Sequence, residues 1–190
     1  MKQNKQIIAI TGLIGSGKST VCAILRKKGE ITLNCDEINA ELLTEKKYID
    51  GLQKLFPQAF VEGLLHKNVL RKIVFSSDNE RLKLNEYSHK EIKKRLEEKI
   101  KEISAQKIFV EVPLLTDQMF ISLFDTIWIV KAEENEQLQR IIHRDQISEE
   151  QALQILRTQQ NITYSKPTEI IINTGDINEL EEQIIKILKK

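Results

Sequence analysis

The sequence predicts an α/β protein with three layers, in which helices cover a five-stranded, mostly parallel sheet. Two observations predict this class. Short apolar runs, too short for buried helices, alternate with longer segments of helical periodicity, and the helical segments between the runs are typical of crossover connections. One of these runs leads into a glycine-rich turn and then a helical pattern, as a strand in such a sheet does. The expected strands are residues 7–10, 31–33, 108–112, 127–130 and 169–172.

The helical segments predict two departures from a simple alternation of strands and helices. Roughly 70 mainly helical residues separate the second expected strand from the third, which indicates a helical insertion rather than one crossover helix. Within it, residues 82–103 carry apolar side chains at steps of three or four among charged ones. Ser148 and Gln151 predict a capping box for a helix that runs to about Gln160. We therefore expect a helical hairpin over residues 136–164.

Size and charge exclude several classes of function. With 190 residues, 41% of them hydrophobic, the chain can bury one core and is expected to form one domain. A net charge of +1 creates no field that attracts nucleic acid or an anionic membrane. Two cysteines and no apolar run of membrane-spanning length give little support to a disulfide framework, a zinc site or a membrane protein. We expect a cytoplasmic protein with no obligate protein partner.

The strongest motif is GLIGSGKS at residues 12–19, a complete GxxxxGKS pattern between a strand and a helix. Its glycines allow the backbone amides to turn toward phosphate oxygens, and the helix N-terminus adds partial positive charge. Lys18 would reach the β- and γ-phosphates and Ser19 would bind Mg²⁺. An incidental glycine-rich turn is the alternative, but motif and context together favour ATP binding. The expected ATP-binding residues of this loop are Gly12, Ile14, Gly15, Ser16, Gly17, Lys18, Ser19 and Thr20.

The motif alone does not identify the reaction. No Asn-Lys-x-Asp sequence follows the loop, which argues against a GTPase. A small chain with a helical insertion and an edge hairpin fits a small-molecule kinase. Asp36 follows the second strand, at an end of the sheet where ligands bind, and could accept a proton from an acceptor hydroxyl. It could equally be a helix N-cap, and its position does not distinguish the two roles.

Several further segments resemble the dephospho-CoA kinase family along nearly the whole chain. Besides ITGLIGSGKSTV at the loop, they are LNCDEI (33–38), EGLLHKNVLRKIVF (62–75), LNEYSHKEI (84–92), EVPLLTD (111–117), QLQRIIHRDQIS (137–148), ALQILRTQQ (152–160) and IIINTG (170–175). The resemblance implies a P-loop kinase fold, with Mg²⁺ as cofactor. It also implies transfer of the ATP γ-phosphoryl to the 3′-hydroxyl of the dephospho-CoA ribose, the last step of coenzyme A biosynthesis.

The resemblance also implies roles for individual residues. Asp36 corresponds to the catalytic aspartate, and Arg140 to an arginine that reaches the transferring phosphate. Arg144, one helical turn further, would contact ATP, although without the resemblance an ordinary solvated helix face is the favoured explanation for both arginines. His89 and Leu114 would contact the acceptor, and a partly buried surface histidine is the alternative for His89.

Two further residues have competing explanations. Glu111 would support Mg²⁺ through water, or else form a structural hydrogen bond to the loop. Asn173 lies where adenine could bind, or in a simple turn after the strand. The chain also departs from the family pattern at several positions, which leaves details of acceptor binding open: Asn34, Lys90, Asp117, Pro167 and Thr168.

The expected organisation has three parts within one domain. The core is about 1–35, 106–135 and 165–190, the acceptor-binding helical part about 36–105, and the lid about 136–164. Two rival functions remain. The chain could be a nucleoside or nucleoside-monophosphate kinase of the same architecture, or a nucleotide-dependent interaction switch that hydrolyses ATP slowly.

Overall fold

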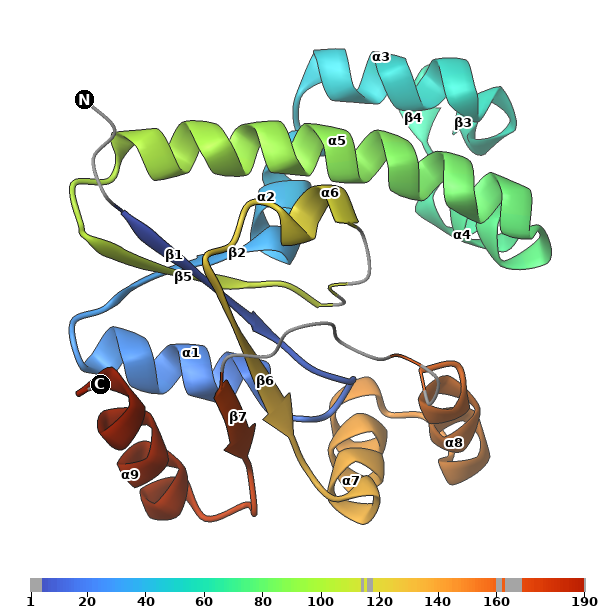
Figure 1. Ribbon diagram of the computed structural model, residues 1–190. Helices are drawn as coiled ribbons and strands as arrows, with labels where there is room; N and C mark the ends of the chain where they lie inside the picture. Colours follow the sequence, from blue (N-terminus) through green and yellow to red (C-terminus); the bar gives the residue numbers. More distant parts are fainter. Residues whose placement is uncertain (1–4, 114, 116–117, 160–161, 163–168, 190) are drawn as a thin grey trace. The chain divides into compact units, whose positions relative to one another are not determined.

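The computed structural model of the chain describes residues 5–113, 115, 118–159, 162 and 169–189 (Figure 1). The chain divides into two compact units. One combines residues 1–34 with 104–190, and the other comprises residues 35–103. Among the described residues, no helix has both the length and the apolar character needed to cross a membrane.

A five-stranded sheet forms the centre of the first unit. All of its neighbouring strands pair in parallel, as the sequence predicts, and β1 is the middle strand. The carboxyl ends of β1, β2 and β5 meet, since Ile10 and Asn34 are both in register with Glu111. In sheet order the strands are β2 (Ile31–Asn34), β5 (Lys107–Glu111), β1 (Gln6–Thr11), β6 (Thr126–Lys131) and β7 (Glu169–Ile172).

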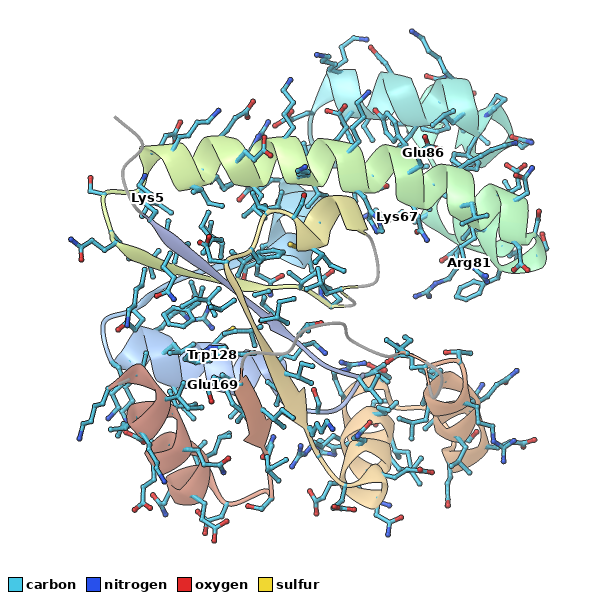
Figure 2. The ribbon with its side chains drawn as sticks, in the orientation of Figure 1. Lys5, Lys67, Arg81, Glu86, Trp128 and Glu169 are labelled. Atoms are coloured by element: carbon cyan, nitrogen blue, oxygen red, sulfur yellow. The ribbon has the colours of Figure 1, made fainter. Side chains whose placement is uncertain are left out.

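Helices α1 (Lys18–Lys27) and α9 (Ile177–Leu188) lie side by side against the sheet (Figure 1). Their apolar faces and the strands form one core cluster, which includes Ile10, Leu25 and Leu180. Trp128 on β6, labelled in Figure 2, packs edge-on against the ring of Phe109, with ring centroids 5.1 Å apart. This core fixes α1 against the sheet, with its first turn one short loop after the middle strand β1. A short helix, α6 (Gln118–Ile121), precedes β6.

The expected helical hairpin consists of α7 (Glu134–Asp145) and α8 (Glu149–Arg157). Both hydrogen bonds of the predicted capping box between Ser148 and Gln151 are present. The second helix ends at Arg157 rather than near Gln160, and the Thr158 hydroxyl donates to the Ile155 carbonyl (2.6 Å) after the last turn. A small apolar cluster fills the hairpin: Leu138, Ile141, Ala152 and Leu156.

The second unit is mainly helical. Its longest helix, α5, is capped by the Ser77 hydroxyl and buries Ile92, Leu96 and Ile100, which confirms the apolar stripe predicted there. Leu82 is 64% exposed and does not belong to that buried stripe. A short antiparallel hairpin precedes α4 and was not expected from the sequence. The elements are α2 (Cys35–Leu42), α3 (Lys46–Leu55), a 3₁₀ turn (Pro57–Ala59), β3 (Phe60–Val61), β4 (Leu64–Leu65), α4 (Lys67–Ser76) and α5 (Asp78–Glu102).

Candidate active site

The glycine-rich loop forms a cradle between β1 and α1. Gly17 is the N-cap residue of α1 and has a left-handed backbone (φ 96°), and no side chain caps the helix. The N-cap residue therefore offers no side-chain acceptor to the amides of the first helical turn, which is the arrangement that binds phosphate at a helix N-terminus. Ser19 and Thr20 are exposed in that turn. The Ser16 side chain is buried, and its hydroxyl oxygen has no hydrogen-bond partner among the described residues.

Lys18 lies across the loop that precedes it. Its Nζ donates hydrogen bonds to the carbonyl oxygens of Gly12 (2.9 Å) and Leu13 (3.1 Å). The ammonium group is therefore held at the loop rather than extended away from it, and a phosphate in the cradle would lie within reach of a positive charge.

Two side chains from distant parts of the sequence support the loop. Asn173, buried after β7, donates from Nδ2 to the Ser16 carbonyl (2.8 Å). Arg140, on α7, donates from Nη1 to the Gly15 carbonyl (3.2 Å) and from Nη2 to the Glu136 carboxylate (3.1 Å). The structure therefore brings Arg140 and Asn173 to the phosphate-binding loop.

Arg144 differs from Arg140 although it lies one turn further along α7. Its guanidinium donates two hydrogen bonds to the carboxylate of its neighbour Asp145, 2.7 and 2.8 Å long, and its side chain is 60% exposed. The hydrogen bond from Arg144 lowers the pKa of the Asp145 carboxyl.

Glu111 marks the carboxyl end of β5 and is mostly buried. Its Oε2 accepts a hydrogen bond from Nδ2 of Asn34 on the adjacent strand (3.1 Å). On α1, burial together with the charge and hydrogen bond of Glu111 raises the pKa of the Cys22 thiol. Cys22 and Ser19 are three residues apart on α1, so the Glu111 carboxylate lies beside the helix face that carries the Ser19 hydroxyl.

Comparisons with known proteins agree on one family. The family model for dephospho-CoA kinase matches residues 6–179. The chain belongs to the dephospho-CoA kinase family. The curated dephospho-CoA kinase of Carboxydothermus hydrogenoformans is 36% identical, over 97% of this chain and 93% of its own. That of Thermus thermophilus is also 36% identical, over 96% of this chain and 90% of its own.

Solved structures show the fold of the chain. A crystal structure from Thermus thermophilus matches with a TM-score of 0.85 and 32% identity, over 98% of this chain and 97% of that chain. Shikimate kinase from Bacteroides thetaiotaomicron matches with a TM-score of 0.53 and 14% identity, over 97% of this chain and 99% of that chain, and shows the fold alone. These matches confirm the P-loop kinase fold. Dephospho-CoA kinases are ATP-dependent, and the family catalyses the final step of coenzyme A biosynthesis.

The residues that the family resemblance connects with the acceptor belong mostly to the second unit. Asp36 is exposed in the first turn of α2, and His89 is half-buried on α5. Helix α2 packs against α5. Leu114 lies outside the described residues, as do Asp117, Pro167 and Thr168.

The second unit also has a mainly apolar groove that the sequence did not predict. Its volume is about 270 Å³, and it brings together the two segments 62–75 and 84–92. At one border the Tyr48 hydroxyl forms hydrogen bonds with Asn39 (3.1 Å) and Ser88 (3.0 Å). The remaining lining residues are Leu43, Leu52, Leu65, Lys67, Leu70, Arg71, Val74, Phe75 and Leu84.

Sequence reasoning also missed one residue at the loop. Gln159, beyond the end of α8, accepts a hydrogen bond at Oε1 from the Ile14 backbone N–H (2.8 Å). No local pattern identifies this pair, because 145 positions separate the two residues.

Proposed function

We propose that this kinase transfers the γ-phosphoryl group of ATP to the 3′-hydroxyl of the dephospho-CoA ribose. The hydroxyl oxygen forms a bond to the γ-phosphorus, the bond from that phosphorus to the β–γ bridging oxygen breaks, and coenzyme A and ADP are the products. One observation carries the proposal. In this member of the dephospho-CoA kinase family, the phosphate-binding loop leads into a helix with no side-chain cap, and Lys18 and Arg140 both donate to the loop backbone.

The loop and its neighbours account for the donor half of the reaction. Amides of the loop and of the α1 N-terminus bind the phosphates, and Lys18 neutralises their charge. The Arg140 guanidinium would exchange the Gly15 carbonyl for oxygens of the transferring phosphoryl group. Asn173 supports the loop backbone from behind, in addition to the adenine contact expected for it. Arg144 contributes at most to the outer edge of the ATP site.

The residues near α1 fit a magnesium ion bound together with ATP. Mg²⁺ takes oxygen ligands and is held by one or two protein groups plus phosphates and water. The exposed Ser19 hydroxyl and the Glu111 carboxylate beside α1 supply that type of ligand. The bound ion would neutralise charge on the phosphates.

Lys18→Ala should raise KM for ATP and lower kcat, and unchanged kinetics would contradict this account of the loop.

Asp36 is proposed as the general base that takes the proton of the ribose hydroxyl. Its place directly after β2 supports the proposal. Asp36→Asn should leave ATP binding unchanged and lower kcat by about 10²–10⁴-fold, the usual contribution of acid–base catalysis. Glu37→Gln is the matched control, since Glu37 is exposed on the same turn of α2. Full activity of the Asp36 variant with both substrates saturating would contradict the assignment.

The groove of the second unit is proposed to bind the pantetheine arm of the acceptor. Its apolar lining suits the arm, and Lys67 (labelled in Figure 2) and Arg71 could bind the diphosphate. Phe75 is 75% exposed beside the groove, a large apolar side chain available to a ligand. His89 and Leu114 remain proposed acceptor contacts.

Three variants test the groove. Phe75→Ala should raise KM for dephospho-CoA about tenfold and leave the KM of adenosine 5′-monophosphate, which lacks the arm, unchanged. Lys67→Ala removes a charge proposed to bind the diphosphate, and it should raise the KM of both acceptors, because adenosine 5′-monophosphate keeps a 5′-phosphate. Lys72→Ala is the control for charge, because Lys72 is exposed on α4 outside the groove. Equal effects of Phe75→Ala on the two acceptors would place the arm elsewhere.

Other sequence predictions stay proposals. They are the division into a core, an acceptor-binding part (36–105) and a lid (136–164), closure of that lid over ATP, and a cytoplasmic location. Closure would exclude water, which could otherwise accept the γ-phosphoryl group.

The deciding experiment measures ADP release with and without dephospho-CoA, together with a panel of nucleosides and nucleoside monophosphates. We expect release that depends on dephospho-CoA and a product identified as coenzyme A by mass spectrometry. A strong preference for a nucleoside or its monophosphate would overturn the proposal in favour of another small-molecule kinase. ATP consumption that ignores every small acceptor and requires a protein would indicate an interaction switch.

A further inference from the structure

The phosphate-binding loop is attached to the α7–α8 hairpin at its outer turn. The Ile14 side chain packs against the apolar cluster inside the hairpin. Gly15 lies so close to α7 that a Cβ there would be 2.7 Å from the Gln137 carbonyl oxygen, and its backbone is left-handed (φ 75°). Neighbouring loop residues therefore contact the hairpin through both backbone and side chain.

Gln159 completes this attachment from the far end of the hairpin. Its side-chain oxygen accepts the Ile14 N–H at 2.8 Å in a partly buried position. Its own backbone is held as well, because its N–H donates to the Leu156 carbonyl (2.9 Å) and its carbonyl accepts from the Ile162 N–H (3.1 Å). The Gln159 side chain therefore extends from a fixed point after α8 to the loop.

The position of this contact separates two parts of the loop. The amides at the start of α1 follow Gly17, whereas Gln159 binds the loop three residues earlier, at the Ile14 N–H. The outer turn at Ile14 and Gly15 carries the carbonyl that Arg140 binds. Arg140 belongs to the same hairpin whose end supplies Gln159. Gln159 thus determines how the outer turn, and with it the Arg140 guanidinium, is aligned with the helix N-terminus.

We propose that Gln159 is a positioning residue for phosphoryl transfer, which acts through the Ile14 N–H to align the outer turn of the loop with Arg140. It touches neither substrate. Its loss would leave the N–H unpaired in a partly buried place and loosen the alignment, while the amides at the start of α1 keep their place. Its effect therefore falls on kcat rather than on ATP affinity. This assignment rests on the kinase activity proposed above.

Two substitutions at Gln159 and one control test the proposal. Gln159→Met preserves the length of the side chain and removes the acceptor, and it should lower kcat about tenfold with KM for ATP changed less than about threefold. Gln159→Glu keeps an acceptor oxygen and should restore kcat to within about threefold at saturating ATP, although its charge raises KM for ATP. Gln154→Met, at an exposed glutamine of α8, should match the wild type.

The coupling to Arg140 is tested by a double-mutant cycle. In an Arg140→Lys background, Gln159→Met should lower kcat by less than about twofold, because the alignment it provides has no guanidinium to act on. A wild-type kcat for Gln159→Met, a Glu variant as slow as the Met variant, or full additivity with Arg140→Lys would each overturn the proposal. If Gln159→Met unfolds, Gln159→Ala, which also removes the acceptor, replaces it in both comparisons under the same criteria.

The choice of acceptor separates this test from that of the proposed function. All variants are compared with the acceptor that the wild-type protein phosphorylates in the panel. Failure to phosphorylate dephospho-CoA would contradict the substrate assignment, whereas the comparison of Gln159 variants would still decide whether this residue aligns the transfer.

Discussion

Replacing Gly17 with alanine would place a methyl group where the Asn173 side chain lies. A Cβ built on Gly17 falls 2.1 Å from Nδ2 of Asn173, far inside contact distance. The Asn173 amide would have to move, and it would lose its hydrogen bond to the Ser16 carbonyl. Gly29 offers a matched control, because its backbone is also left-handed (φ 86°) but, its chain neighbours aside, no atom of the described residues lies within 4 Å of its built Cβ.

The size of the effect follows from two contributions. Alanine at a left-handed position costs about 1–2 kcal/mol, and this applies to both glycines. Displacing Asn173 from a buried hydrogen bond adds about 2 kcal/mol for Gly17→Ala only. In a chain of this length 1 kcal/mol corresponds to about 2–4 °C in Tm. We therefore expect Gly17→Ala to lower Tm by about 4–8 °C more than Gly29→Ala does.

Thermal unfolding of the nucleotide-free protein, followed by circular dichroism, measures this difference. Asn173→Ala removes both the obstacle and the hydrogen bond, so Gly17→Ala added to that variant should lower Tm no more than Gly29→Ala does in the wild type. Equal losses for the two glycines, or an undiminished loss in the Asn173→Ala background, would refute the reasoning.

Three further predictions concern other groups around the loop. Asn34→Asp places a second carboxylate beside Glu111 and should lower Tm by about 2–4 °C in magnesium-free buffer. MgCl₂ should reduce this loss of Tm. Acid should also reduce it, because protonation of the two carboxylates relieves their repulsion. Burial and Glu111 raise the pKa of the Cys22 thiol. In the native protein this thiol should therefore remain unalkylated by iodoacetamide at pH 9, and it should react once urea unfolds the chain. Rapid alkylation of the native protein would contradict this. Arg140→Lys should lower kcat about 10–100-fold and Arg144→Lys less than about threefold, and similar losses would remove the distinction between the two arginines.

Local sequence patterns account for the framework of the first unit. The five β-branched runs became the five strands, and the Ser148–Gln151 pattern became a capping box, because each signal depends on residues close together in the chain. The glycine-rich loop could also be predicted from local sequence, since the left-handed backbone it needs occurs at Gly15 and Gly17, where glycine permits it.

The supporting contacts could not be predicted in the same way. Asn173 and Ser16 are 157 positions apart, and only the packing of β7 and α7 near the loop determines that Asn173 meets it. The β3–β4 hairpin was missed for a local reason. Its turn places Glu62 at φ 51°, a conformation that glutamate rarely adopts, so the Glu62–Gly63 pair is a weak turn signal.

The two cations at the loop show how its stability and its chemistry can be separated. Lys18 and Arg140 both donate to backbone carbonyls of the loop itself, so neither charge has to be brought in from solvent when ATP binds. Phosphate oxygens are stronger acceptors for these groups than neutral carbonyls, and ATP can therefore displace the carbonyls with a net gain. Replacing Arg140 frees the Gly15 carbonyl but leaves Asn173 in contact with Ser16. The loop should then keep its conformation while the transition state loses a bidentate donor, which is why a variant that barely changes Tm can still abolish most of the turnover.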